Sequence, residues 1–528
     1  MKKSVIHAIE ERLNCDFILE KPKDLSLGHY ATPIAFNLAK KLKKSPTIIA
    51  DELCKKFENS TIFKKVTSLK GYINFNLNEE FLNKHASLAI MNQKNFAKSN
   101  KNQTILLEYV SANPTGPLHI GHARGAILGD SLYRIGKHLG YKISTEYYVN
   151  DAGNQIAMLG LSIFLAGQQH VLKVDVKWPE EFYRGEYIID LAITASKEFG
   201  SSIFEDKKNI EKLSIWAKDK MLELIKSNLA DIGIKFEKFV SEKSLYSKWD
   251  ESFKKLKKSN KTFTNDGKTW IRSTDFSDEK DRVIIREDGR PTYLAGDIIY
   301  HNNKYQRKYD HYINIWGADH HGYILRVKAA INFLGYDEKK LEVILAQMVT
   351  LLKGKEPYKM SKRAGSFILM SDVVRDAGSD ALRFVFLSKK NDTHLDFDVD
   401  MFKQEDSSNP IFYINYAHAR INQVFKKSGK TLEDIKDIKL KNLNDDAVNL
   451  LYTALLLPEV LEDAFKLRQL QKLTEYLKNL SSNFHKFYNE NRVIGEQDED
   501  KFLKIFAMVG LSLRTGLNLI GIKAKNKM

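Results

Sequence analysis

The sequence predicts an α/β protein: a Rossmann-like parallel-sheet domain with insertions, a small α+β N-terminal domain and an all-α C-terminal bundle. The stretch 104–110 (TILLEYV) is continuously apolar, like strands that are buried on both faces of a parallel sheet. A loop rich in Pro, Gly and Asn follows, then a helix from about Leu118 and a second strand candidate at 143–149. This strand–loop–helix–strand order is a βαβ unit, the building block of nucleotide-binding sheets. From Asp380 onward, apolar residues recur at three- and four-residue steps, which predicts amphipathic helices.

A chain of 528 residues is too long for one hydrophobic core, so we expect several domains. We place the N-terminal domain at 1–100, where helical periodicity is followed by the alternating strand pattern of 71–77. We expect the sheet domain at 101–379, interrupted by a more helical insertion at about 150–280, and the helical bundle at 380–528. Sheet strands are expected again after the insertion at 282–287, 311–317 and 341–349.

The composition bounds the partners and the compartment. The net charge of +16, from 83 Lys and Arg against 67 Asp and Glu, fits a polyanionic partner and equally fits a Lys-rich soluble protein. Cys15 and Cys54 are the two cysteines, which excludes a disulfide framework or a Cys-rich zinc site and suits a reducing compartment. The N-terminus lacks the apolar core of a signal peptide, and no run of about 18 apolar residues occurs. We therefore expect a cytoplasmic protein without a membrane partner.

The first motif that carries chemistry is SANPTGPLHIGHARGA (111–126). His119 and His122 are three residues apart, so they share a face in the first turn of the expected helix. Free N–H groups and the helix dipole favour a phosphate there. Gly121 leaves room for a purine and a ribose to approach the backbone. We predict that both histidines are catalytic, as hydrogen-bond donors to an α-phosphate during nucleophilic attack, and that all three residues bind ATP.

The second motif is KEPYKMSKRAGS (355–366), on a loop after an expected strand. Cations at Lys359, Lys362 and Arg363 are suited to neutralising the β- and γ-phosphates as pyrophosphate leaves. A basic loop on its own is more often solvated surface. Paired with the two upstream histidines, we predict that Lys359 and Lys362 bind ATP and act in catalysis.

WGADHHGY (316–323) places Asp319, His320 and His321 together after an expected strand. Such a cluster invites a metal-site interpretation, but no third or fourth ligand is obvious in the sequence. We therefore predict no metal site. At the carboxyl end of a sheet strand, the more fitting role for Asp319 and His320 is contact with the ribose or adenosine of ATP.

HIGH followed by KMSKR resembles the paired signature of class I aminoacyl-tRNA synthetases. The surrounding segments resemble the arginyl branch of that family, and the resemblance extends from about residue 20 to the C-terminus. The segments that carry it are 108–126, 148–156 (YVNDAGNQI), 291–298 (PTYLAGDI), 316–323, 380–384 (DALRF) and 409–421 (NPIFYINYAHARI).

The resemblance implies ATP-dependent ligation of L-arginine to tRNA(Arg) through an arginyl-adenylate, with release of AMP and pyrophosphate. ATP would enter as its Mg²⁺ complex, and the family has no structural metal here. It also implies a monomer that needs tRNA even for the first step. Lys362 departs from many arginyl enzymes, which lack this second lysine.

A guanidinium is planar, charged and carries five donors, so its pocket needs a carboxylate and further acceptors in a fixed array. Tyr293 and Asp297 are four residues apart and would share one helical face. By resemblance these two residues contact the guanidinium, Glu108 belongs to the same pocket, and Asn113 with nearby Ser111 holds the substrate's α-carboxylate or ammonium. The full set expected to bind arginine is Glu108, Ser111, Asn113, His119, Tyr293 and Asp297; Met348 and Val349 are expected, by resemblance alone, to offer backbone groups to adenine.

The expected tRNA contacts lie in two places. Aromatic rings beside an arginine can stack on unpaired bases, and 409–421 resembles the start of a DALR-type anticodon-binding domain. An aromatic stripe at helical spacing is, however, more often core. The segment 26–40 resembles the small added domain that touches the outer corner of tRNA, although His29 replaces the family's usual acidic residue. The candidate tRNA-binding residues are Tyr413, Tyr416, His418 and Arg420.

Three other functions compete with this interpretation. Nucleotidylyltransferases with HIGH-like motifs are much shorter and lack the helical C-terminal third. Synthetases for large apolar residues carry long editing insertions, and the cysteinyl enzyme needs zinc ligands. A non-catalytic RNA-binding paralogue is disfavoured because both phosphate-handling motifs and the expected guanidinium acceptors are intact.

Overall fold

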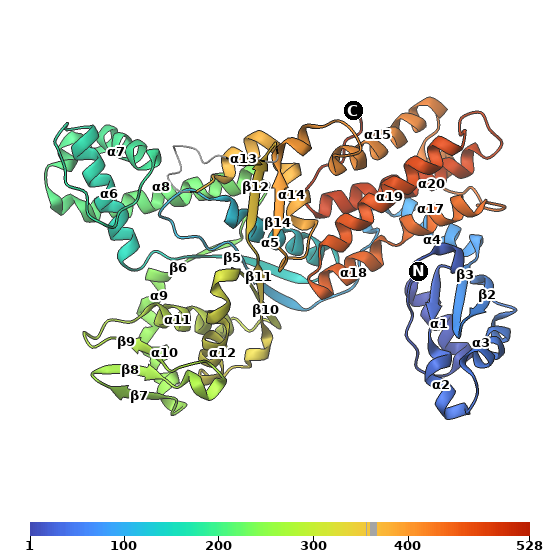
Figure 1. Cartoon of the computed structure of the whole chain (residues 1–528), viewed down its shortest axis with the longest axis horizontal. Helices are drawn as coiled ribbons and strands as arrows, with labels where there is room; N and C mark the ends of the chain where they lie inside the picture. The colour runs from blue at the N-terminus through green and yellow to red at the C-terminus, as the bar shows by residue number, and fades with distance from the viewer. Residues whose placement is uncertain (355, 359–366) are drawn as a thin grey trace. The chain divides into compact units, whose positions relative to one another are not determined.

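The computed structural model describes residues 1–354, 356–358 and 367–528. By their internal contacts these form two compact units (Figure 1). The first unit comprises 1–98, 405–467 and 472–528, and the second comprises 99–404 and 468–471. Each unit is described by itself.

The second unit is built on a five-stranded parallel sheet in the order β11-β10-β4-β5-β6. Taken along the chain, this is the 3-2-1-4-5 order of a doubly wound sheet, which reverses direction between β4 and β10. Ligands bind such sheets at the carboxyl ends of the strands on either side of that reversal. The strands are β4 (Thr104–Glu108), β5 (Lys142–Val149), β6 (Lys238–Ser241), β10 (His311–Gly317) and β11 (Leu341–Ala346), and helix α5 (Ile120–His138) connects β4 to β5.

The range expected to be one insertion, 150–280, is corrected in one respect: it contains β6, the edge strand of the parallel sheet. Before β6, three helices pack around their own apolar core, with Phe164 and Phe204 fully buried (Figure 1). Residues 282–287, expected in the main sheet, instead contribute an outer strand to a small antiparallel sheet in the order β7-β8-β9. The elements are α6 (Asn154–His170), α7 (Glu186–Phe199), α8 (Ile210–Asp231), α9 (Glu242–Leu245), α10 (Trp249–Lys258), β7 (Thr262–Asn265), β8 (Lys268–Ile271), β9 (Arg282–Ile285), α11 (Tyr293–Gln306) and α12 (Ile324–Phe333).

The expectation of continuous helix from Asp380 is wrong at its start. Strand β14 (Leu395–Asp398) pairs in parallel with β12 (Val349–Lys353), which also pairs with β13 (Glu356–Pro357). Leu395 and Phe397 are buried between more exposed aspartates, a two-residue alternation that identifies a strand. The DALRF string lies on α14 (Ser379–Leu387), which follows α13 (Met370–Ala377) in the second unit.

The N-terminal part of the first unit is α+β, with a three-stranded antiparallel sheet in the order β1-β3-β2. His29 is buried there: its Nδ1 accepts a hydrogen bond from the Leu77 N–H (2.9 Å), and its carbonyl accepts one from the Tyr452 hydroxyl (2.6 Å). The residue that departs from the family pattern is thus a packing residue in this structure. The elements are α1 (Lys2–Leu13), β1 (Tyr30–Thr32), α2 (Ile34–Leu42), α3 (Pro46–Cys54), β2 (Phe63–Leu69), β3 (Tyr72–Leu77) and α4 (Glu79–Met91).

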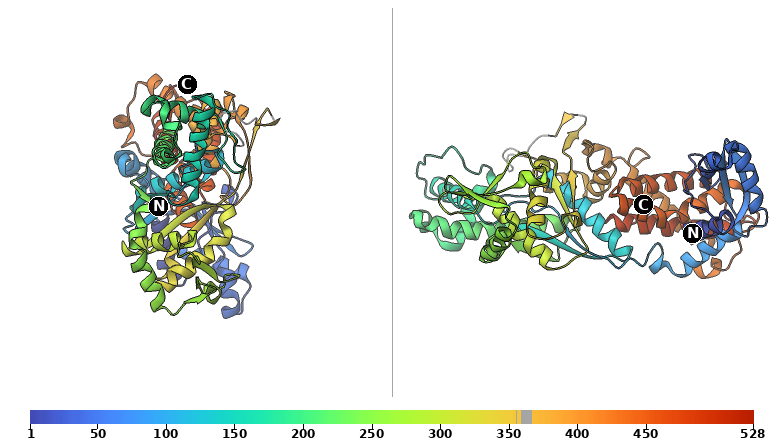
Figure 2. Two further views of the ribbon diagram at one scale, coloured as in Figure 1. Left: turned by 90° about the vertical axis from the view of Figure 1, so that its left-hand side faces the viewer. Right: turned by 90° about the horizontal axis from the view of Figure 1, so that it is seen from below.

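The rest of the first unit is a helical bundle in which α20 packs against α15, α17 and α4 (Figure 2). Among the described residues, α20 alone is long and apolar enough to cross a membrane, but it is mostly buried inside the protein. It is therefore the core helix of the bundle. The helices are α15 (Pro410–Ser428), α16 (Leu432–Ile435), α17 (Asp445–Leu455), α18 (Leu457–Leu467), α19 (Gln471–Glu490) and α20 (Glu499–Leu519).

Candidate active site

The two histidines of the first motif form the N-terminal cap of α5, directly after the loop that leaves β4. His119 is the N-cap residue, and its Nδ1 accepts a hydrogen bond from the Gly121 N–H (3.2 Å). His122 Nδ1 in turn accepts one from the His119 N–H (3.3 Å). Because each Nδ1 is an acceptor, the proton of each neutral ring sits on Nε2, which is left as a donor.

The two rings lie together, with centroids 3.7 Å apart. Burial lowers the pKa of His122 to about 3 and also lowers the pKa of His119. Both rings are therefore neutral at physiological pH. Gly121 fits tightly beneath them, because an added Cβ would lie 2.9 Å from Cε1 and 3.0 Å from Nδ1 of His119. The role expected of Gly121, room for the nucleotide, thus extends to room for the His119 ring.

The chain that follows the second motif returns to the first one. Ile120 N–H donates to the Ile368 carbonyl (3.0 Å), and Met370 N–H donates to the Leu118 carbonyl (2.9 Å). The Phe367 ring lies 5.6 Å from that of His119. Residues 367–370, which follow the second motif, thus lie beside the first motif. Lys359, Lys362 and Arg363 themselves lie outside the described residues.

A second cluster, of acidic and tyrosine side chains, begins on α11. As expected from their spacing, Tyr293 and Asp297 lie on one helix, with Tyr293 53% exposed and Asp297 partly buried. Burial and the neighbouring charges of Glu242 and Glu108 raise the pKa of Asp297 to about 7. Glu242 lies so close that its Oε1 would be 2.3 Å from a Cβ built on Gly296. These carboxyls share a region of high negative potential.

Glu242 is a residue that sequence reasoning missed. Its side chain is buried, and its Oε1 accepts a hydrogen bond from the Tyr246 hydroxyl (3.1 Å). Its buried Oε2 has no hydrogen-bond partner among the described residues. Burial raises the pKa of Glu242 to about 7. The Tyr148 hydroxyl also acts on this carboxyl, as a hydrogen bond that lowers its pKa. A buried carboxylate oxygen without a donor is costly, so a ligand N–H at Oε2 would stabilise it. The segment around Glu242 (SEKSL) carries no motif that singles it out.

Glu108 lies at the end of β4 and is buried. Its Oε2 forms an ion pair with the fully buried Lys304 ammonium, which also donates to Asn314 Oδ1 (2.8 Å). Its Oε1 accepts from the Ser111 hydroxyl (3.1 Å). Since Lys304 balances its charge, Glu108 organises the loop, and the net negative charge of the cluster comes from Asp297 and Glu242.

The loop from β4 to α5 is held in a strained conformation. Val110 and Ser111 both have positive φ angles, of 70° and 44°, which is costly for a β-branched residue. The Ser111 hydroxyl stabilises this strained conformation by accepting a hydrogen bond from the Tyr148 N–H (3.1 Å). Asn113 is positioned by this loop, and its Nδ2 donates to Gln155 Oε1 (2.5 Å). The signature 148–156 thus supports the loop that carries Ser111 and Asn113.

Asp319 and His320 lie on the short helical turn that follows β10, as expected, and both are exposed. His320 Nε2 lies 3.5 Å from Asp319 Oδ2. Within the described part of the chain, no group of three or more His, Cys, Asp or Glu is placed to hold a metal ion. Met348 and Val349 lie where β11 passes into β12, and Met348 is 63% exposed.

Of the four candidate tRNA-binding residues, two, Tyr416 and Arg420, form a compact, half-buried cluster. The Arg420 guanidinium lies 4.4 Å from the centre of the Tyr416 ring and 5.0 Å from that of Tyr488, which sequence reasoning missed. Tyr413 packs on the His485 ring at 4.3 Å. His418 does not join the surface: it is 3% exposed, and its Nδ1 hydrogen-bonds the Lys525 carbonyl (2.9 Å). It occupies the core position that helical spacing favours.

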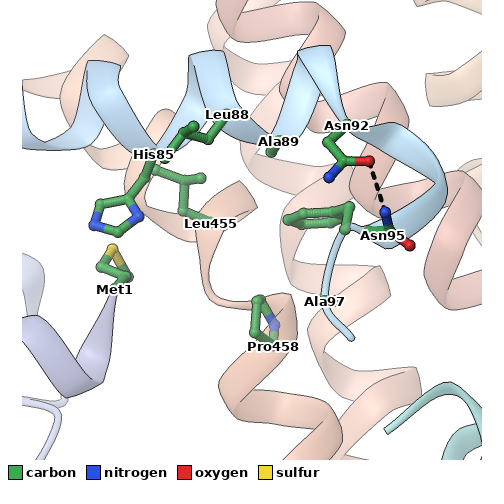
Figure 3. Close-up of a pocket in the computed structure, with 10 residues that line it drawn as sticks. Met1, His85, Leu88, Ala89, Asn92, Asn95, Ala97, Leu455 and Pro458 are labelled. Carbon is green, nitrogen blue, oxygen red and sulfur yellow. Dashed lines mark hydrogen bonds between the residues drawn. The ribbon is translucent and has the colours of Figure 1, made fainter. Parts of the chain in front are cut away.

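An open pocket of about 210 Å³ in the first unit contains none of the candidate site residues (Figure 3). Its polar side chains are the amides of Asn92 and Asn95, which hydrogen-bond each other at 2.8 Å, and the imidazole of His85. Burial lowers the pKa of His85 to about 4, so this ring is neutral. The described lining offers no carboxylate for a guanidinium and no side-chain cation for a phosphate.

Comparison with known proteins agrees with this geometry. Three family models cover the chain: the arginyl tRNA synthetase N terminal domain at 1–77, the catalytic domain of class I (R) tRNA synthetases at 85–438 and the DALR anticodon binding domain at 414–528. An arginine–tRNA ligase of Nitratiruptor sp. is 62% identical over all of both chains.

The chain belongs to the arginyl-tRNA synthetases of class I. The arginine–tRNA ligase of Campylobacter curvus is 59% identical over the full length of both chains. A solved arginyl-tRNA synthetase from Campylobacter jejuni matches with a TM-score of 0.83 and 58% identity, covering 86% of this chain and all of that one. The Thermus thermophilus enzyme, at 19% identity, a TM-score of 0.78 and full coverage of both chains, shows the same fold.

These findings confirm the family and the fold class expected from the sequence. The class I fold implies ATP as a substrate, generally with Mg²⁺. The DALRF string at 380–384 lies before the residues that match the DALR model. Arg383 of this string is buried; it pairs with Asp130 of α5 and donates to the Ile232 carbonyl (2.6 Å). This arginine therefore binds together elements of the second unit.

Proposed function

We propose that this chain ligates L-arginine to tRNA(Arg) in two steps. The arginine carboxylate attacks the α-phosphorus of ATP in line, an O–P bond forms, and pyrophosphate leaves. The terminal ribose hydroxyl of tRNA then attacks the carbonyl of the arginyl-adenylate, and AMP leaves. Mg²⁺ enters with ATP and balances the phosphate charge. Positioning and electrostatics supply the catalysis, without a covalent intermediate on a side chain.

The observation that carries this proposal is the pairing of two opposite environments in one unit. A helix N-terminus with two neutral histidine donors suits a phosphate, and the raised-pKa carboxyls of Asp297 and Glu242 suit a guanidinium. Helix α5 follows β4 and the Glu242 helix α9 follows β6 of the doubly wound sheet, and the Asp297 helix α11 leads into β10 of the same sheet. His119 and His122 would donate through Nε2 to the α-phosphate, while Gly121 keeps the ring of His119 in place.

The substrate contacts follow from these placements. Asp297 and Glu242 would bind the guanidinium, with the exposed Tyr293 ring at the mouth of the cluster. Asn113, supported by Ser111 and Glu108, would hold the α-amino or α-carboxyl group. The remaining assignments rest on the family pattern: Asp319 and His320 at the ribose, Met348 and Val349 at adenine, and Lys359 and Lys362 at the β- and γ-phosphates.

We place tRNA contacts on both parts of the first unit. Tyr416 and Arg420 present a cation and rings that can stack on unpaired bases, with Tyr413 beside them. His418, being buried, would support this surface from within. We assign 1–100 to a tRNA-contacting domain, 101–404 to catalysis and 405–528 to anticodon binding, because 380–404, expected in the last domain, belong to the second unit. We further propose a cytoplasmic monomer without structural metal or membrane contact.

The test is aminoacylation of total tRNA with each of the twenty amino acids, using wild type and Asp297→Ala. We expect charging by arginine alone, lost in the variant. Charging by another amino acid would overturn the guanidinium pocket, and no charging would support the non-catalytic RNA-binding paralogue. ATP–pyrophosphate exchange with arginine should require tRNA; exchange without tRNA would contradict that requirement.

A further inference from the structure

Arg124 is one of the largest fully buried side chains and belongs to the first motif, yet the roles predicted for that motif do not involve it. It lies on α5, five residues after His119, and is 1% exposed. Burial lowers its pKa, the direction expected of a cation removed from water. A buried guanidinium is stabilised by the hydrogen bonds that it donates, and here these come from Nη1 and Nη2, because the buried Nε has no hydrogen-bond partner among the described residues.

The partners of Arg124 are backbone carbonyls on two separate chain segments. Its Nη1 donates to the carbonyls of Gln347 (3.0 Å), Met348 (3.4 Å) and Thr393 (2.7 Å), and its Nη2 donates to that of Lys390 (2.8 Å). The guanidinium therefore fastens the β11–β12 connection and the loop before β14 to the helix that begins at His119.

These hydrogen bonds orient two peptide groups. In a trans peptide the C=O and the following N–H point in opposite directions. Because the carbonyls of Gln347 and Met348 point at Arg124, the N–H groups of Met348 and Val349 point away from it. The Met348 N–H is occupied by the side chain of its own neighbour, Gln347 Oε1, at 2.9 Å. That side chain can rotate aside without disturbing the backbone.

We propose that Arg124 is a positioning residue that fixes the backbone which reads adenine. The inference rests on the proposed function, in which residues 348–349 meet the adenine of ATP. The edge of adenine presents an acceptor, N1, that requires a backbone N–H in a fixed direction. Arg124 fixes the direction of that N–H and links its peptide to α5, the helix proposed to bind the α-phosphate. The adenine site and the phosphate site are therefore held in a fixed position relative to each other. Without ATP, the Gln347 side chain accepts the hydrogen bond of the Met348 N–H, and adenine takes the place of that side chain on binding.

The test compares Arg124→Lys with Arg134→Lys, a matched arginine on the same helix. Arg134 bonds Asp130 (2.7 Å) and the Gly233 carbonyl (2.9 Å), away from residues 347–349. A lysine at 124 keeps the charge, but its single ammonium cannot span both segments. We expect the KM for ATP to rise about tenfold to a hundredfold in Arg124→Lys, as for lost hydrogen bonds to a charged group. The KM for arginine and the kcat should stay within twofold, and Arg134→Lys should change neither KM.

The outcomes separate this inference from the proposed function. If wild type does not charge arginine, the proposed function fails. If wild type charges and Arg124→Lys raises both KM values equally, or neither, the positioning role is wrong. Should Arg124→Lys fail to fold by circular dichroism, Gln347→Ala decides. This substitution frees the Met348 N–H. The KM for ATP should then fall about fivefold, as expected when adenine no longer competes with one neutral hydrogen bond. An unchanged or higher KM for ATP overturns the inference.

Discussion

The start of α5 is suited to an anionic phosphate, and the acidic cluster on α9 and α11 is suited to a cationic guanidinium. In both regions, burial shifts the pKa values of the ionisable side chains. At the helix start, burial lowers the histidine pKa values, so the rings are neutral donors. In the acidic cluster, burial raises the pKa values of Asp297 and Glu242 to about 7. In both regions of the free protein, burial thus favours the neutral form of the ionisable groups.

The difference lies in what a ligand restores. A phosphate needs donors of fixed direction, and the neutral Nε2–H groups supply direction without requiring a proton from solvent. A guanidinium needs negative charge, so its arrival must shift Asp297 and Glu242 toward ionisation. Binding at the acidic cluster should therefore be linked to pH, whereas donation by the histidines should be constant above about pH 6.

The Asp297→Ala substitution removes a carboxylate from the acidic cluster and has the largest expected effect. Losing one partner of a buried charge pair costs about 2–5 kcal/mol, so kcat/KM for arginine should fall roughly a hundredfold to a thousandfold. The KM for ATP should stay within twofold. Asp288→Ala, at an exposed carboxylate paired with Arg290, is the control and should leave arginine kinetics unchanged. Equal losses for ATP and arginine would mean that Asp297 supports the fold rather than the substrate.

The His122→Asn substitution removes one imidazole donor from the start of α5, where the phosphate is proposed to bind. Removing one donor to the developing charge should lower kcat about a hundredfold or more, with the KM for arginine unchanged. Steady-state aminoacylation at saturating tRNA measures this split. His170→Asn, at an exposed position, is the control. A raised KM for arginine with normal kcat would assign His122 to the other region.

The Gly121→Ala substitution tests whether the position of the His119 ring at the start of α5 matters for catalysis. The added Cβ would lie 2.9–3.0 Å from the His119 ring, so the ring must move and kcat should fall about tenfold to a hundredfold. Gly125→Ala on the same helix is matched, because its Cβ meets Ile315 at an ordinary 3.6 Å. If both variants keep full activity, the position of the His119 ring does not matter for turnover.

The smallest effect is the pH dependence of arginine binding. Asp297 and Glu242 bind protons below about pH 7, so the KM for arginine should rise about tenfold from pH 8 to pH 6. In the free protein these raised pKa values reduce stability as pH rises from about 4 to 7, and bound arginine offsets this. The increase in Tm on adding arginine should thus be larger at pH 8 than at pH 6; a pH-independent increase would contradict the linkage.

The βαβ unit and the first motif were accessible from sequence because they depend on local patterns. The apolar run at 104–110, the cap at His119 and the spacing of Tyr293 and Asp297 each involve residues close along the chain. Strand β6 was missed because it is only four residues long and lies among helices. The residues 395–398 alternate clearly but follow a helix, and the expected helical region obscured them.

By itself, the sequence determined the family, the doubly wound sheet and the two histidines at a helix N-terminus, since long motifs and local periodicity encode them. The tertiary structure decided which charges are balanced and which are not. Lys304 neutralises Glu108 from another element, Glu242 joins Asp297 from far along the chain, and Arg124 collects carbonyls from two segments. Burial and pairing depend on which segments meet in three dimensions, and a linear pattern does not carry that information.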